Sequence, residues 1–213
     1  MDDERGIDRR IDEVAWDQLF HAFGTAGDTA HHLRALAAGR ECAQAAAHVG
    51  TAIVHQSTVW PASADALRLG CEVLSVTVLP VPAVDGVLAA LAEAGRVLSL
   101  EVGGDPQLPR RAREAFFEAR RLAAEGVADD EVRYGPGDDE PVTDEAGEIV
   151  VEILFTEFPD EAAEWMRSAV VRMRELAPLV LETLDALGRR GAASPELLDA
   201  CRRAWAEPAA VRR

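Results

Sequence analysis

The 213-residue sequence contains no lysine and no asparagine, and aromatic residues make up only 5% of it. All 22 basic side chains are therefore arginines, and 38 acidic side chains bring the net charge to −16. A surface that binds nucleic acid needs an excess of cationic charge to neutralise phosphates. The composition therefore argues against a protein that binds nucleic acid over a broad surface, and we expect no nucleic-acid partner.

Cysteines and long apolar runs are also scarce. An odd number of widely separated cysteines, at positions 42, 71 and 201, predicts buried free thiols in a reducing compartment rather than a disulfide scaffold. No apolar run approaches the roughly 20 residues that a membrane span needs. The first five residues, Met-Asp-Asp-Glu-Arg, lack the cationic start and apolar stretch of a signal peptide. We therefore expect a cytoplasmic protein with no membrane partner.

The negative charge is concentrated in residues 127–164, which contain 14 acidic residues and one arginine. This stretch carries −13 of the total −16, so the rest of the chain is nearly balanced. The excess fits either a solvated acidic loop or a surface for a basic protein, because complementary charge speeds association and selects the partner. The hypothetical partner-binding residues are Asp129, Asp130, Glu131, Tyr134, Asp138, Asp139, Glu140, Glu148, Glu152, Glu157, Asp160, Glu161, Glu164 and Trp165. Trp165 fits a core position equally well.

Apolar residues at helical spacing, interrupted by glycine and proline, predict about nine helices. The expected helical segments are 12–23, 28–39, 40–56, 63–76, 83–100, 110–125, 160–190 and 195–206, with a bend or break near Pro178. Residues 127–147 read as a loop. Residues 148–158 fit a strand or a helix, and we favour a helix because their neighbours are helical. The pattern as a whole predicts an all-α fold.

The first five expected helices alternate as a short helix, a turn, a longer helix and a proline-rich break. Alanine, at 39 positions, lets helices approach closely. This arrangement predicts stacked antiparallel helix pairs, a HEAT-like α-α superhelix. No motif recurs at a fixed spacing, so an irregular helical bundle is the alternative. We expect one helical repeat domain over residues 1–213, with an acidic loop or insertion at about 127–147.

Two segments of the N-terminal third, WDQLFHAFGTAGDTAHHLRALAAGR (16–40) and IVHQSTVWPASADAL (53–67), carry a recognisable pattern. They resemble actinobacterial HEAT-repeat-like proteins over about residues 14–70. The matching positions are Trp16, Leu19, His21, Ala22, Phe23, Gly24, Asp28, Leu33, Leu36, Ile53, His55, Gln56, Val59, Trp60, Pro61, Ala62 and Ser63. The absence of lysine and asparagine, which have AT-rich codons, fits a high-GC actinobacterial source. The resemblance implies an interaction scaffold without catalytic residues, and some relatives resemble immunity proteins of bacterial toxin systems.

The histidines offer the only other candidate chemistry. His31 and His32 are adjacent and point about 100° apart on a helix, while His48 and His55 are two turns apart. The sequence has no HExxH motif and no paired cysteines, and its acidic clusters lack the spacing of a calcium loop. His21 and His55 could converge if their helices pack. We nevertheless predict no catalytic, metal-binding or cofactor-binding residues.

These observations predict a non-enzymatic protein–protein interaction module, an immunity-type inhibitor or adaptor that binds a basic partner through an acidic surface. One alternative is a small helical enzyme or metal-binding protein that uses His21 and His55. A second alternative is a structural subunit of a larger assembly, in which the concave face of the superhelix makes the contact.

Overall fold

The structure, a computed structural model, describes residues 2–100, 110–129 and 145–206. These residues form ten α-helices and two short antiparallel hairpins, so the predicted all-α class is confirmed. The helices are α1 (Asp2–Asp12), α2 (Thr29–Ala37), α3 (Cys42–His48), α4 (Ser63–Val76), α5 (Val81–Leu100), α6 (Arg110–Asp129), α7 (Glu145–Glu157), α8 (Pro159–Glu175), α9 (Ala177–Arg190) and α10 (Pro195–Ala206). The hairpin strands are β1 (Phe20–His21), β2 (Gly24–Thr25), β3 (Val54–His55) and β4 (Thr58–Val59). Three short helical turns are η1 (Trp16–Gln18), η2 (Ala26–Asp28) and η3 (Val49–Ile53).

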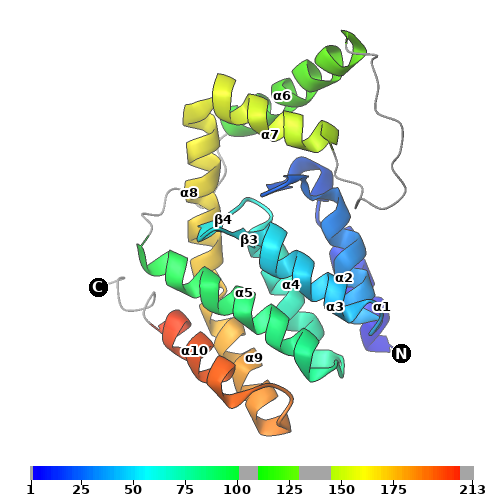
Figure 1. Cartoon of the computed structure of the whole chain (residues 1–213), viewed down its shortest axis with the longest axis vertical. Helices are drawn as coiled ribbons and strands as arrows, with labels where there is room; N and C mark the ends of the chain where they lie inside the picture. The colour runs from blue at the N-terminus through cyan, green and yellow to red at the C-terminus, as the bar shows by residue number, and fades with distance from the viewer. Residues whose placement is uncertain (1, 101–109, 130–144, 207–213) are drawn as a thin grey trace.

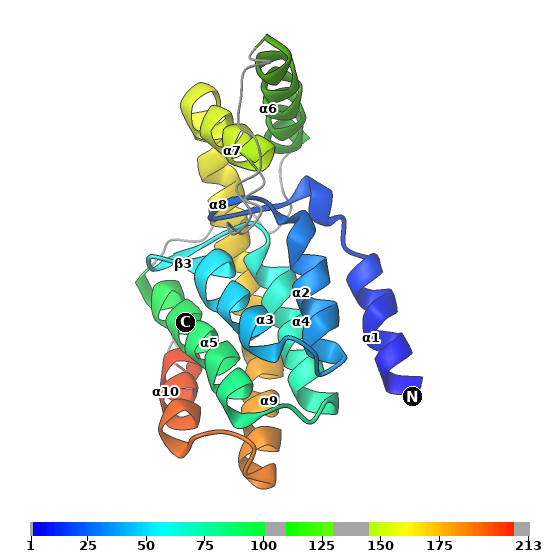
Figure 2. The same ribbon diagram turned by 45° about the vertical axis from the view of Figure 1, so that its right-hand side comes forward.

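Three helix pairs, α2–α3, α4–α5 and α9–α10, form a stack of two layers (Figure 1). Helices α3, α5 and α10 pack side by side in one layer, and α2, α4 and α9 in the other. Helix α1 packs against α2 and α4. Helices α6 and α7 lie beyond the end of this stack, and α8 runs back along it (Figure 2). We call α6, α7 and the first half of α8 the lobe.

The stack depends on close approach between helices at positions without a side chain. A Cβ atom on Gly95 of α5 would lie 2.8 Å from the Cβ of Ala204 in α10. A Cβ on Gly86 would lie 3.0 Å from the Cβ of Ala46 in α3. The fully buried Trp205 donates from its indole Nε1 to the carbonyl oxygen of Leu91 at 2.7 Å. Glycine and alanine therefore set the spacing of the layer α3, α5 and α10.

A second, smaller core contains most of the aromatic rings that are buried in the described part of the chain. Phe20 stacks on Phe116 of α6, with ring centroids 5.8 Å apart, and meets Trp165 of α8 edge-on at 5.5 Å. Trp60 and Phe155 contact the same Phe20 ring at 6.3 Å each. Phe20 is a residue of β1, and its ring packs in the core of the lobe. The first hairpin therefore joins the lobe to the stack.

The predicted helix over 12–23 is wrong. Helix α1 ends at Asp12, where that prediction began, and the chain continues through η1 into the hairpin of β1 and β2. Gly24 has φ of 132°, a conformation outside the helix. Phe20 packs between α6 and α8, a long-range contact that no local spacing reveals. Trp16 and Phe20 are buried, but they are not on one helical face.

The predicted helix over 40–56 is wrong in its second half. Helix α3 ends at His48, the π-helical turn η3 follows, and β3 and β4 then pair as a hairpin. The two turn residues Gln56 and Ser57 have φ of 48° and 57°, as a tight two-residue hairpin turn requires. The β-branched Val54 and Val59 pair across this hairpin.

The remaining helices follow the sequence pattern closely. Helix α4 has the predicted bounds, and residues 148–157 of the favoured helix over 148–158 are helical within α7, while Phe158 lies between α7 and α8. Leu176 separates α8 from α9, which confirms the break near Pro178. Helix α6 continues to Asp129 and α7 begins at Glu145, so both extend into the predicted loop 127–147, of which residues 130–144 lie outside the described residues. No helix within the described ranges is both long enough and apolar enough to cross a bilayer.

Candidate functional site

The predicted acidic surface is described only in its second half. Six of its members lie in 130–144, outside the described residues, namely Asp130, Glu131, Tyr134, Asp138, Asp139 and Glu140. The side chain of Asp129, at the end of α6, is not described either. The structure therefore bears only on the residues from Glu148 onward.

The described part of the acidic surface lies on α7 and the start of α8. Glu148, Glu152, Glu157 and Asp160 are exposed, and Glu161 and Glu164 are half-buried. Glu164 pairs with Arg111 of α6 across a 2.8 Å hydrogen bond. For the other five carboxylates the described part of the chain provides no ion pair, and the sequence has no basic residue between Arg133 and Arg167. A cation-free acidic face therefore remains.

The placement of Trp165 on this surface is wrong. Its side chain is 5% exposed and lies in the aromatic core of the lobe, against Phe20 and Phe116. Trp165 turns inward because it lies on the face of α8 that packs on α6. An aromatic residue that the sequence had not singled out is exposed instead. Phe155 of α7 is 40% exposed and, at i+3 from Glu152, lies on the same helical face as Glu148 and Glu152.

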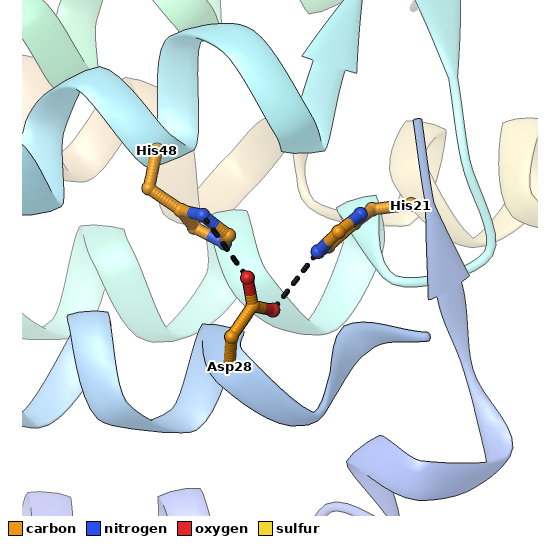
Figure 3. Close-up of side chains that lie close together, drawn as sticks. All are labelled: His21, Asp28 and His48. Atoms are coloured by element: carbon orange, nitrogen blue, oxygen red, sulfur yellow. Dashed lines mark hydrogen bonds and ion pairs between the residues drawn. The ribbon is translucent and has the colours of Figure 1, made fainter. Parts of the chain in front are cut away.

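A second candidate site gathers histidines around Asp28 (Figure 3). Asp28, at the end of η2, lies between His21 of β1 and His48 at the end of α3. One carboxylate oxygen accepts a hydrogen bond from Nε2 of His21 at 2.9 Å, and the other lies 3.8 Å from Nδ1 of His48. His32 stacks on His48 with ring centroids 4.2 Å apart. We call these four residues the histidine cluster.

The backbone of the first hairpin determines which nitrogen of His21 carries a proton. The amide of Phe23 donates to Nδ1 of His21 at 3.1 Å. Nδ1 must therefore be unprotonated, so the proton is on Nε2 and points at Asp28. His21 is 3% exposed while the Asp28 side chain is 52% exposed. The hairpin thus presents an oriented N–H group to a carboxylate at the surface.

Burial keeps His48 and His32 neutral. Burial lowers the pKa of His48 to about 4; the Asp28 charge raises this pKa, and the nearby His32 and His21 lower it. Burial is also the main cause that lowers the pKa of His32. For Asp28, burial alone would raise the pKa, but the hydrogen bond and charge of His21 and the fields of His48 and His32 lower it. The cluster is thus most stable with one carboxylate beside the neutral rings of His48 and His32.

This arrangement lacks a nucleophile. The hydroxyl of Thr29 lies 3.0 Å from Nε2 of His48, which resembles the order of groups in a nucleophile–histidine–carboxylate triad. Thr29 is fully buried, however, so no substrate can reach its oxygen. The bond to Thr29 instead satisfies a buried ring nitrogen. Buried polar groups need hydrogen-bond partners, and this need at the junction of α2 and α3 explains the contact without catalysis.

Metal binding is the other chemistry that this donor set suggests. His21, Asp28 and His48 offer ligand atoms within 4.8 Å of one another. A metal would need the lone pair of Nε2 on His21, which would move the proton to Nδ1. Nδ1 already accepts the Phe23 amide, so two donors would then face each other. The residues present therefore do not fit a metal in this geometry.

His21 and His55, which the alternative reading of the sequence would bring together, do not face each other. The His55 ring packs edge-on against Phe23 at 5.0 Å, while His21 faces Asp28 and His48. The sequence reasoning missed His48, because only the packing of α2 on α3 brings it to Asp28. No spacing rule could have indicated it, since these residues are 20 positions apart.

The cysteines are ordinary core or near-core residues. All three are free; Cys71 and Cys201 are buried, whereas Cys42 is half-buried. Burial raises the pKa of both the Cys71 and the Cys201 thiol to about 12. The buried-thiol prediction is therefore confirmed for these two and is wrong for Cys42.

The two segments that carry the family resemblance meet in space. They form the two hairpins, which are joined by backbone hydrogen bonds from Ala22 to Ala52 at 3.1 Å and from Ala62 to Phe20 at 3.2 Å. Two of the matching residues, Ala22 and Ala62, therefore donate the hydrogen bonds that link the two hairpin regions. Comparison of the chain with protein-family models, with curated proteins and with solved structures finds no match.

Proposed function

We propose that this chain is a non-enzymatic protein-interaction module of the immunity or adaptor type, which binds a basic protein through the face of α7. The paired helices α2–α3, α4–α5 and α9–α10 support a HEAT-like repeat as its scaffold. In this proposal α6–α8 are an insertion between the second and third pairs that carries the binding surface.

The observation that carries the proposal is the unpaired acidic face around Phe155. We define the α7 face as Glu148, Glu152 and Phe155, whereas Glu157 lies at the C-terminal end of the same helix on its other side. On α6, by contrast, the exposed acids whose side chains are described have arginine partners: Glu114 with Arg110 at 2.7 Å, for example. The α7 face has none among the described residues, and its aromatic ring is 40% exposed.

Helix stability does not explain this face. Glu148 and Glu152 are one turn apart, where like charges destabilise a helix by about 0.2–0.5 kcal/mol. Glu157 is at the C-terminal end of α7, where the helix dipole disfavours an anion. Asp160 and Glu161, by contrast, are in the first turn of α8 and favour that helix. The α7 face thus carries a structural cost that a cationic partner would relieve.

The chemistry of the face fits a protein partner. Carboxylates around an exposed aromatic ring match the make-up of interface anchors, in which a central ring is surrounded by polar groups. Two exposed charges on successive turns would steer a basic partner and set its orientation. An arginine-rich surface with an apolar pocket for the Phe155 ring is the expected complement.

The test compares two double charge reversals that change the net charge equally. Glu148→Arg/Glu152→Arg alters the α7 face, and Glu175→Arg/Glu182→Arg alters exposed acids of α8 and α9 that have no described ion pair. Partners are captured from the source cells on the full chain, and the affinity of the purified partner is then titrated. We expect the first variant to lose about tenfold or more in affinity, and the control to stay within about twofold.

Salt dependence supplies the second readout. We expect the affinity of the unaltered chain to fall about tenfold between roughly 50 and 300 mM salt, because exposed charge pairs are screened. An affinity that ignores salt, or equal losses in both double variants, contradicts the proposal. Binding that is unaffected by Phe155→Ala would remove the ring from the interface.

A further inference from the structure

The described residues line a large, half-open cavity to which the α7 face contributes no side chain. Its volume is about 830 Å³, within the usual range for small-molecule sites. Four regions wall it: the end of α1 with η1, the first half of α4, the start of α6, and the middle of α8. The cavity therefore lies where the lobe meets the stack, between the two hydrophobic cores.

The wall of this cavity is cationic in a protein of net charge −16. Two carboxylates, Glu13 and Asp65, line it against five arginines. The arginines are Arg10, Arg68, Arg110, Arg113 and Arg172. A concave wall of one sign focuses its field on the space that it encloses. The cavity is thus suited to an anion.

Three of the arginines are held in place by a chain of ion pairs. Arg172 meets Asp65 at 2.6 Å, and Asp65 also lies 3.8 Å from Arg68. Arg68 bonds Glu72 at 2.8 Å, and Glu72 pairs with Arg10 at 2.8 Å. Three guanidinium groups thus share two carboxylates. The chain is left with one excess positive charge and with N–H donors that outnumber their acceptors.

The two arginines of α6 are less constrained. Arg110 bonds Glu114 on the solvent side of its own helix at 2.7 Å, and its side chain is 91% exposed. Arg113 is exposed and has no ion pair within the described part of the chain. Planar guanidinium groups bind carboxylate and phosphate through two parallel hydrogen bonds. Arg113 can therefore close on an anion that the fixed arginines hold from the other side.

Aromatic side chains provide the rest of the binding surface. Phe116 and Trp165 line the cavity from the core of the lobe, and Phe117 is 48% exposed at its edge. Leu19 and Pro61 add apolar surface from the side of the stack. Flat apolar surface beside charged groups binds ligands that have an apolar body and a charged head.

We propose that this cavity binds a small organic anion with two or more negative charges on carboxylate or phosphate groups and an apolar or aromatic body. Arg10, Arg68 and Arg172 hold the head group from the stack, and Arg113 holds it from the lobe. Phe117 packs on the body. This site is independent of the α7 face.

Calorimetric titration of the full chain tests the proposal with four probes: 1-naphthyl phosphate, naphthalene-2,6-dicarboxylate, inorganic phosphate and uncharged 2-naphthol. We expect one of the two charged aromatic probes to bind at least about tenfold tighter than inorganic phosphate and 2-naphthol. The tighter of the two identifies the head group as phosphate or carboxylate.

Two variants separate charge from packing, and both alter exposed side chains, which limits effects on folding. Arg113→Gln should weaken every anionic probe about tenfold, whereas Arg203→Gln on α10, the matched control, should change none by more than about twofold. Phe117→Ala should weaken the aromatic anions about fivefold and leave inorganic phosphate unchanged. Ala15→Trp, which fills the cavity from an exposed position, should abolish binding.

Several results would overturn the proposal. These are no binding of either charged aromatic probe at about 1 mM, equal binding of 2-naphthol, or binding that Arg113→Gln and Ala15→Trp leave intact. The variant Glu148→Arg/Glu152→Arg should retain the ligand, because neither residue lines the cavity. If the cavity binds no anion, the proposed protein interaction through the α7 face is unaffected. If the α7 face binds no protein, the proposal for the cavity is likewise unaffected.

Discussion

At the scale of single residues, one backbone amide determines the character of the histidine cluster. The Phe23 amide occupies Nδ1 of His21, which leaves Nε2 as the donor to Asp28. Only 8% of the His48 side chain is exposed, so burial disfavours the protonated, charged form of its ring. The cluster is therefore a polar joint between the first hairpin, α2 and α3, and its stability depends on pH.

The protonation of His48 predicts acid sensitivity above pH 4. Its pKa is about 4 in the folded chain against 6.5 for an ordinary histidine, so between these values the unfolded state binds more protons. The stabilisation is fully present above pH 6.5 and is lost as the pH falls toward 4. We expect the free energy of unfolding to drop by about 2 kcal/mol from this residue between pH 7 and pH 5.

Urea unfolding of His48→Gln at pH 7 and pH 5 measures this contribution. The variant should show a smaller drop than the unaltered chain, because glutamine does not titrate. His31→Gln is the control, since its side chain is 73% exposed and should leave the pH dependence unchanged. Parallel pH profiles for the unaltered chain and His48→Gln would contradict the assignment.

Zinc should not stabilise the protein. Binding at His21, Asp28 and His48 would break the hydrogen bond from Phe23, so we expect about 100 µM Zn²⁺ to raise the melting temperature by less than about 1 °C. Differential scanning calorimetry with and without the metal provides the measurement. A larger rise that disappears in both His21→Gln and Asp28→Asn would show that the cluster holds the ion after all.

At the scale of elements, glycine positions decide how closely helices and hairpins approach. Helix α5 contacts α10 at Gly95 and α3 at Gly86, and each position has neighbouring atoms where a Cβ would be. The β1–β2 hairpin contacts α7 in the same way through Gly24. These contacts hold the third pair and the lobe to the stack.

Gly95→Ala should destabilise the chain although alanine favours helices. The new Cβ would lie 2.8 Å from the Cβ of Ala204 and 2.9 Å from the Trp205 ring, and such overpacking costs about 1–3 kcal/mol. Gly6→Ala in α1 has no atom within 4 Å, so it should stabilise by about 0.5–1 kcal/mol. Chemical denaturation of both variants gives the sign of the change in the free energy of unfolding for each. Equal changes in the two variants would refute the packing argument.

Gly24→Ala should weaken the attachment of α7. The position combines φ of 132° with a Cβ that would lie 3.0 Å from the backbone nitrogen of Glu148, so we expect a loss above about 2 kcal/mol. Gly191→Ala is the comparison, because Gly191 also has positive φ, at 60° in the left-handed helical region, but has no neighbour within 4 Å. Its cost should stay near about 1 kcal/mol. Comparable losses in thermal stability for the two variants would mean that strain alone, not the contact with α7, is decisive.

At the scale of the whole molecule, two cores of unequal size share α8. The larger core runs through the stack, and the smaller contains Phe20, Phe116, Trp165 and the apolar side chains of α6 and α7. The organic-anion cavity lies between them, and the α7 face lies on the smaller one. Both proposed binding sites therefore depend on the position of the lobe.

The lobe should open more easily than the stack. Fewer buried apolar residues hold it, and local opening free energies follow such packing. We expect backbone amides of α6 and α7 to exchange hydrogen faster than those of α4 and α5. The substitution Phe20→Ala should accelerate this exchange more in α6 and α7 than in α9. Uniform protection across α4–α7, measured by mass spectrometry, would show one cooperative unit instead.

Much of the helical content was predictable because it depends on local rules. The bounds of α4, the break at Leu176 and the start of α10 at Pro195 follow from apolar spacing and from proline and glycine positions. The two hairpins were missed because their decisive features, the positive φ of Gln56 and Ser57 and the long-range packing of Phe20, are not visible in apolar spacing.

The amino-acid sequence by itself determined the all-α class, the acidic block and most of the helix boundaries, since propensity, periodicity and charge act within a few residues of each other. Only the tertiary structure decided which charges remain unpaired. It buried Trp165 and exposed Phe155, brought His48 to Asp28, and placed five arginines around one cavity of a protein with net charge −16. Pairing and burial depend on contacts between helices far apart in the chain, and such contacts leave no local pattern.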